Sequence, residues 1–130
     1  MAGQIERDFV ADARAPGAAR AFAREALDDL LGPHASVDLR DDLQLIVSEL
    51  VTNAVRAGSP RVQVALGLER TRVVVRVTDS AVGWPEQRAA SDKDPGGRGL
   101  PLVSALSATW GVRLVQQGKV VWAELAVPAQ

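Results

Sequence analysis

Two polar residues stand one helical turn apart, on the border of an apolar helical face. Glu49 and Asn53 are four positions apart, so on a helix they lie on one stripe, with Asp42 and Arg56 above and below them. Groups in this position can be partly buried and directed at a molecule held beside the helix. The pattern also fits a solvated polar face, although Asn53, the single asparagine of the chain, is a mediocre helix former.

Asp79 is a second candidate, because it directly follows the strand-like segment VVVRVT and precedes Gly83 by four residues. A carboxylate at a strand end can accept a hydrogen bond from an amine of a ligand. A nearby glycine allows the ligand to approach the backbone closely. An aspartate at this position is equally consistent with ordinary turn formation.

A third candidate is the sequence Gly96-Gly97-Arg98-Gly99, which precedes a short helical segment. Backbone amides at a helix N-terminus, together with the helix dipole, can hold a phosphate. A flexible loop would have the same composition. The segment is not a Walker A loop, because GxxxxGK[ST] is absent, and it lacks the third glycine of a Rossmann fingerprint.

The scarce residue types narrow the chemistry further. The chain has no cysteine and one histidine, His34, which excludes thiolate chemistry, cysteine-based metal sites and two-histidine metal sites. A formal net charge of -1 gives no electrostatic footprint for nucleic acid, and 47% apolar residues fit a globular protein. Without a signal peptide or a membrane-length apolar run, we expect a cytoplasmic protein with no membrane or direct nucleic-acid partner.

The spacing of apolar residues predicts the elements that must position these candidates. Pro16 opens a helix that Gly32-Pro33 ends, and Ser36 or Asp38 caps a longer helix that reaches about Ala57. Strands are expected over 5–11, 62–68, 73–77, 110–115 and 119–127, with a helix over 100–106. The segment 80–97 has no periodicity, and a loop of this length is usually functional or disordered.

The resulting order, β-α-α-β-β-loop-α-β-β, predicts a single domain over residues 1–130. The expected fold is an α/β two-layer sandwich, with a mostly antiparallel, mixed sheet covered on one face by about three helices. Trp110 and Trp122 are expected to pack between the sheet and the helices.

In this order, the three candidate features resemble the GHKL ATPase superfamily, the fold shared by histidine-kinase catalytic domains, Hsp90 and DNA gyrase. The resemblance is greatest to its small single-domain branch, the anti-sigma-factor serine kinases and related ATP-binding regulators of actinomycetes. It covers nearly the whole chain and implies a Bergerat-type ATP-binding fold. The segments that carry it are SELVTNAV (48–55), VTDSAVGWP (77–85), GGRGLPLVSAL (96–106), and TWG with GKVVWAEL (109–111 and 118–125).

The resemblance implies a role for each candidate residue. Asn53 would help to hold Mg²⁺ between the phosphates of ATP, and Glu49 would be the general base toward the attacking hydroxyl. Asp79 would accept a hydrogen bond from the adenine amino group, beside Gly83. The phosphates would be bound by the amides of Gly97 and Gly99, with Arg98 near the γ-phosphate and the segment 80–96 as a lid.

Two departures from the family pattern bear on ATP binding. The glycine box after Asp79 is reduced to Gly83 alone. The last strand commonly reads Lys-Thr-Val-Trp, and its Thr supports the adenine-binding aspartate, whereas this chain has Val120 at that position. A net hydrogen bond contributes about 1 kcal/mol, so the loss of the hydroxyl is expected to weaken ATP binding roughly fivefold.

Three functions follow from the resemblance. The first is an ATP/Mg²⁺-binding regulator with serine/threonine protein kinase activity, which controls a sigma factor or phosphorylates a small STAS-type anti-sigma factor antagonist. The second is a non-catalytic module whose affinity for a protein partner depends on nucleotide. The third is a pseudo-ATPase scaffold. The branch commonly forms homodimers, so a homodimer is also expected.

Overall fold

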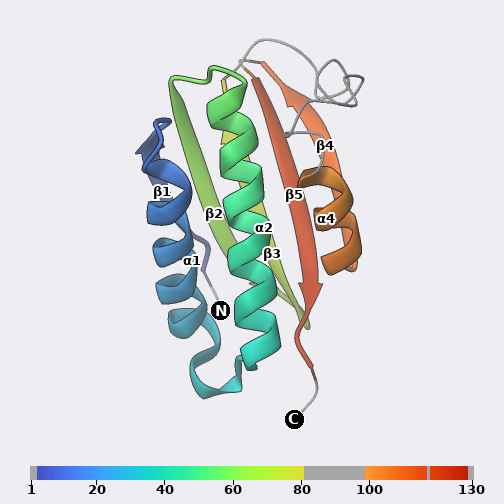
Figure 1. Ribbon diagram of the computed structural model, residues 1–130. Coiled ribbons are helices and arrows are strands. Elements are labelled where there is room, and N and C mark those ends of the chain that lie inside the picture. The colour runs from blue at the N-terminus through green and yellow to red at the C-terminus, as the bar shows by residue number, and fades with distance from the viewer. Residues whose placement is uncertain (1–2, 81–98, 117, 129–130) are drawn as a thin grey trace.

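A computed structural model describes residues 3–80, 99–116 and 118–128 of the chain. In these ranges a five-stranded sheet in the order β1-β2-β3-β5-β4 carries the helices α1, α2 and α4 on one face (Figure 1). Every strand pairing among the described residues is antiparallel, which confirms the predicted two-layer sandwich with a mostly antiparallel sheet. The strands are β1 (Ile5–Val10), β2 (Arg61–Glu69), β3 (Arg72–Asp79), β4 (Thr109–Val115) and β5 (Gly118–Ala126).

The helices begin and end close to the predicted residues. Helix α1 spans Ala15–Leu31 and is followed by a 3₁₀ turn over Gly32–His34. Helix α2 spans Val37–Arg56, and its N-cap is Ser36, whose hydroxyl accepts a hydrogen bond from the Leu39 amide at 3.1 Å. Helix α4 spans Gly99–Leu106. Ser36 therefore caps the helix, and the alternative cap, Asp38, lies inside its first turn.

The core fills the space between the helices and one face of the sheet. Because side chains alternate along a strand, Val62, Val64 and Leu66 of β2 face the helices, and all three are buried. Helix α2 meets them with the apolar positions that its spacing predicted. Its buried residues are Leu39, Leu43, Ile46, Val47, Leu50, Val51 and Ala54. This packing fixes the rotation of α2, and therefore the direction of the polar stripe beside its apolar face.

The two tryptophans of the last hairpin lie on opposite faces of the sheet. Trp110 pairs with Ala123 and packs against the core, as predicted. Trp122 is adjacent to Ala123 on β5, so it faces away from the helices, and the prediction for Trp122 is wrong. Its cross-strand partner is Gly111, where an added Cβ would stand 2.6 Å from the indole Cζ2. The indole therefore covers a position that only glycine leaves open.

Candidate functional site

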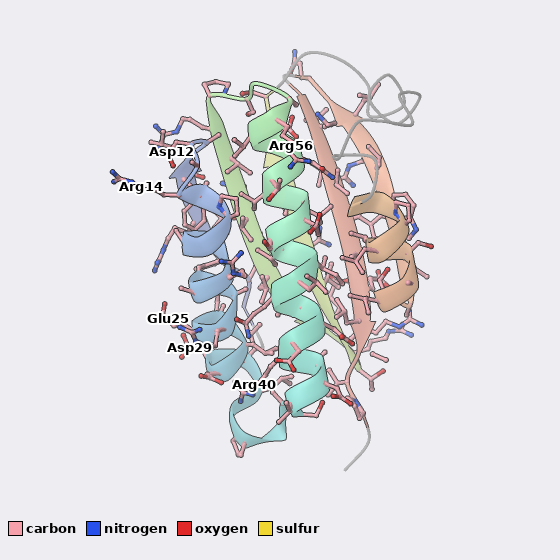
Figure 2. All side chains as sticks on the ribbon, viewed as in Figure 1. Asp12, Arg14, Glu25, Asp29, Arg40 and Arg56 are labelled. Atoms are coloured by element: carbon pink, nitrogen blue, oxygen red, sulfur yellow. The ribbon has the colours of Figure 1, made fainter. Side chains whose placement is uncertain are left out.

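The candidate residues in the described part of the chain gather at one end of the molecule. The last turn of α2, the end of β3 and the start of β5 meet there, and Figure 1 shows them at the same end of the sheet. Figure 2 places Arg56 on that last turn, where its side chain is exposed. Asp42, by contrast, lies about 16 Å back along the helix axis from Asn53, at 1.5 Å per residue. It lines a pocket with Ser36 and Leu106 and is not part of this site.

Glu49 and Asn53 are both half-buried, as expected for residues that border the apolar face of α2. Among the described residues, the Asn53 side-chain oxygen Oδ1 is the one buried side-chain polar atom without a hydrogen-bond partner. A buried acceptor left unpaired costs about 1–3 kcal/mol, so a water, an ion or a ligand is expected to pair with this atom. An amide oxygen is a hard ligand, so Asn53 has the chemistry needed to bind Mg²⁺.

Asp79, the last residue of β3, is buried beside a cation that the sequence reasoning did not identify. The Lys119 ammonium donates a hydrogen bond to Asp79 Oδ1 at 2.9 Å, and the side chains of Lys119 and Asp79 are only 1% and 4% exposed. The two residues are direct cross-strand partners in the β3–β5 pairing, and thus lie on the same face of the sheet as the helices. The pairing of β3 with β5 brings Lys119 to Asp79, and no pattern of neighbouring residues in the sequence predicts that pairing.

Two further contacts hold the peptide group between Asp79 and Ser80. Gly118 precedes Lys119, and a Cβ added to it would stand 1.9 Å from the carbonyl oxygen of Asp79. The hydroxyl of Ser59, in the turn after α2, accepts a hydrogen bond from the Ser80 amide at 3.1 Å. Ser59 itself is buried, and its hydroxyl also donates to the Arg61 carbonyl. The turn that ends the Asn53 helix is thereby joined to the end of β3.

Val120 does not occupy the position that the sequence analysis gave it. Its cross-strand partner is Thr78, so its side chain lies on the helix-free face of the sheet, away from the Asp79 carboxylate. A hydroxyl at position 120 would not reach that carboxylate. The expected fivefold weakening of ATP binding therefore has no structural basis, and the residue that faces Asp79 from β5 is Lys119.

Most of the other candidates lie outside the described residues. Gly97 and Arg98 of the phosphate site, Gly83 of the adenine site and all of the expected lid except Ser80 lie in the segment 81–98, so their predicted roles stay predictions. Gly99 is described as the first residue of α4, which agrees with a helix N-terminus directly after the glycine-rich segment. A pocket of about 540 Å³ has Asp8, Gln63 and Thr78 of the helix-free face in its lining, and it also reaches Asp79 and Ser80 at the end of β3. Asn53 is not among its lining residues.

Comparison with known proteins agrees with this arrangement. Residues 9–125 match the family described as the histidine kinase-like ATPase domain. The chain belongs to this family.

A solved structure supports the same assignment for the histidine kinase-like ATPase domain. It is the histidine kinase domain from the Erythrobacter litoralis EL346 blue-light activated histidine kinase, with a TM-score of 0.58 and 25% sequence identity. The match covers 86% of this chain and 61% of that one, so this chain spans less than two thirds of the solved domain. A search of curated proteins gives no match.

Membership of this family supports the GHKL superfamily assignment and implies ATP binding. The anti-sigma-factor kinase branch, its partners and its serine/threonine specificity stay predictions. In the described ranges, no helix has both the length and the apolar character that crossing a membrane requires.

Proposed function

We propose that this chain is a regulatory protein that binds ATP and Mg²⁺ and transfers the γ-phosphoryl group to a serine or threonine hydroxyl of a protein partner. The observation that carries the proposal is the unpartnered, buried oxygen of Asn53, one turn after the half-buried Glu49. Family membership supports the binding of ATP, and the burial of Asp79 at the same end of the sheet supports a site there for the adenine base.

The residues divide the reaction between them. Asn53 Oδ1 would ligate Mg²⁺, which neutralises charge on the phosphates when it is bound. Glu49 would orient the partner's hydroxyl and accept its proton. The hydroxyl oxygen would then bond to the γ-phosphorus while the bond to the β–γ bridging oxygen breaks, which releases ADP. We propose that the chain acts in the cytoplasm, where it either controls a sigma factor or phosphorylates a STAS-type anti-sigma factor antagonist.

Nucleotide binding is tested first, by titration of MgATP in calorimetry and by thermal shift. Binding should raise the unfolding free energy by about 2.7 kcal/mol when ATP is at a hundred times its Kd. Asn53→Ala should abolish the Mg²⁺ dependence of binding. The matched control is Gln44→Ala, which also removes a side-chain amide from α2. Gln44 lies about two and a half turns from Asn53 and donates a hydrogen bond to the Arg40 carbonyl. If neither variant changes binding, Asn53 is not the metal ligand.

Phosphoryl transfer is tested with γ-labelled ATP and a co-encoded STAS-type antagonist. Glu49→Gln should reduce transfer by a factor of about 10²–10⁴, the usual contribution of a general base, with ATP binding retained. Asp42→Asn is the control, because it removes a carboxylate from the same stripe of α2 at the other end of the helix. If ATP binds but no label moves to the antagonist, the chain is a nucleotide-dependent binding module without kinase activity.

A further inference from the structure

Lys119 is a buried cation that has no role in the proposed phosphoryl transfer or among the residue roles implied by the resemblance to the GHKL superfamily. Among the described residues, three polar or charged residues are buried, Ser59, Asp79 and Lys119, and all three lie at the end of the sheet that carries the candidate site. A buried ion pair is weak evidence for stability, because two apolar side chains of similar volume often serve equally well. Its location beside a binding site is therefore more informative than its strength.

The two side chains have opposite hydrogen-bonding capacities. An ionised carboxylate only accepts, whereas an ammonium group only donates and has three N–H groups. One of these is directed at Asp79 Oδ1, at 2.9 Å, which leaves two donors for other acceptors. The pair thus combines an acceptor and a donor side by side, on adjacent strands and on the helix-facing side of the sheet.

Adenine presents the complementary pair of groups on one edge. Its exocyclic amino group is a donor, and the neighbouring ring nitrogen N1 is an acceptor. We infer that Asp79 and Lys119 together recognise this edge: Asp79 accepts from the amino group, and Lys119 donates to N1. This inference rests on the proposed nucleotide binding and adds to it the residue that determines base specificity.

Guanine has the reverse pattern on the same edge, with a carbonyl oxygen in place of the amino group and an N1–H donor. It would place its carbonyl oxygen against the carboxylate and its N1–H against the ammonium. The free-energy cost of leaving buried polar groups unpaired by the wrong base exceeds the net gain from pairing them with the correct base. The pair therefore predicts ATP binding with strong rejection of GTP.

The test uses the unmodified chain with two analogues of ATP. In 1-deaza-ATP the acceptor N1 is replaced by C–H, and in 7-deaza-ATP the same change is made at N7, on the imidazole side of the amino group. We expect 1-deaza-ATP to bind roughly ten- to a hundredfold more weakly than ATP, as expected for the loss of a charge-assisted hydrogen bond. The Kd for 7-deaza-ATP should change by less than about threefold, because Lys119 does not contact N7.

Variants of Lys119 then assign the effect to this side chain. Lys119→Met should bind ATP more weakly and no longer distinguish ATP from 1-deaza-ATP, and Lys119→Gln, which keeps a donor, should recover part of the difference. Val120→Thr is the matched control, since it changes the next residue on the opposite face. Equal affinities of the unmodified chain for ATP and 1-deaza-ATP would overturn the inference, even if the Lys119 variants do not fold. A preference for N1 that persists in Lys119→Met would overturn it too. If the unmodified chain binds neither nucleotide, the proposed function itself fails.

Discussion

The contribution of the buried Lys119–Asp79 ion pair to stability can be predicted by comparison with an exposed ion pair that has nearly the same N–O distance. The Lys119–Asp79 distance is 2.9 Å, and the side chains are 1% and 4% exposed. The Arg72–Glu124 distance is 2.8 Å, but these side chains are 43% and 28% exposed. Distance therefore does not separate the two pairs, and burial does.

Lys119→Met should destabilise the fold strongly, because it removes the Lys119 ammonium from a buried ion pair and keeps the Asp79 carboxylate buried. The expected loss is about 3–5 kcal/mol of unfolding free energy. At roughly 3–5 °C per kcal/mol for a domain of this size, the melting temperature should fall by about 10–25 °C. Arg72→Met should lose no more than about 1 kcal/mol, since solvent screens the exposed pair and water can hydrate the remaining carboxylate.

Urea denaturation followed by tryptophan fluorescence measures these losses, with the unfolding free energy taken from linear extrapolation. The double variant Lys119→Met/Asp79→Leu removes both charges and should recover most of the stability that Lys119→Met loses. A double-mutant cycle then gives the coupling between the two positions. The reasoning is refuted if Lys119→Met costs less than about 1 kcal/mol, or if the double variant is as unstable as the sum of the two single variants.

Three more predictions follow from other contacts. Gly118→Ala should lower the unfolding free energy by about 1–3 kcal/mol or more and weaken ATP binding, because the new Cβ would stand 1.9 Å from the Asp79 carbonyl oxygen and must displace it. Urea and ATP titrations that match those of the unmodified chain would contradict this prediction. Val120→Thr should leave the Kd for ATP within about twofold, since a hydroxyl there lies on the helix-free face, and a gain near fivefold would restore the original interpretation. Hydrogen bonds from Arg72 and Thr109 lower the pKa of Glu124, so the stabilisation should be complete at neutral pH and lost as the pH falls through that lowered pKa. The difference in unfolding free energy between the unmodified chain and Arg72→Met should therefore shrink as the pH falls. A difference that grows in acid would contradict a lowered pKa of Glu124.

Local patterns in the sequence were sufficient to predict most of the fold. Apolar spacing of three and four residues predicted α1 and α2, and Gly32-Pro33 and Ser36 marked where one helix ends and the next begins. These signals are readable because capping and amphipathicity depend on residues only a few positions apart. The stripe that holds Glu49 and Asn53 was predictable for the same reason, since one helical turn relates the two residues.

Local sequence patterns predict the helices and strands and the residues that one helix places together. Which side chains meet across strands depends on the strand pairing. Lys119 reaches Asp79 only because β5 pairs with β3 across 40 positions of sequence, in a register that opposes the two residues. A shift of that register by one residue would present Val120 to the helix side instead, because strand side chains alternate between faces. That alternation also turned Trp122 away from the core, and no local pattern contains the register that fixes it.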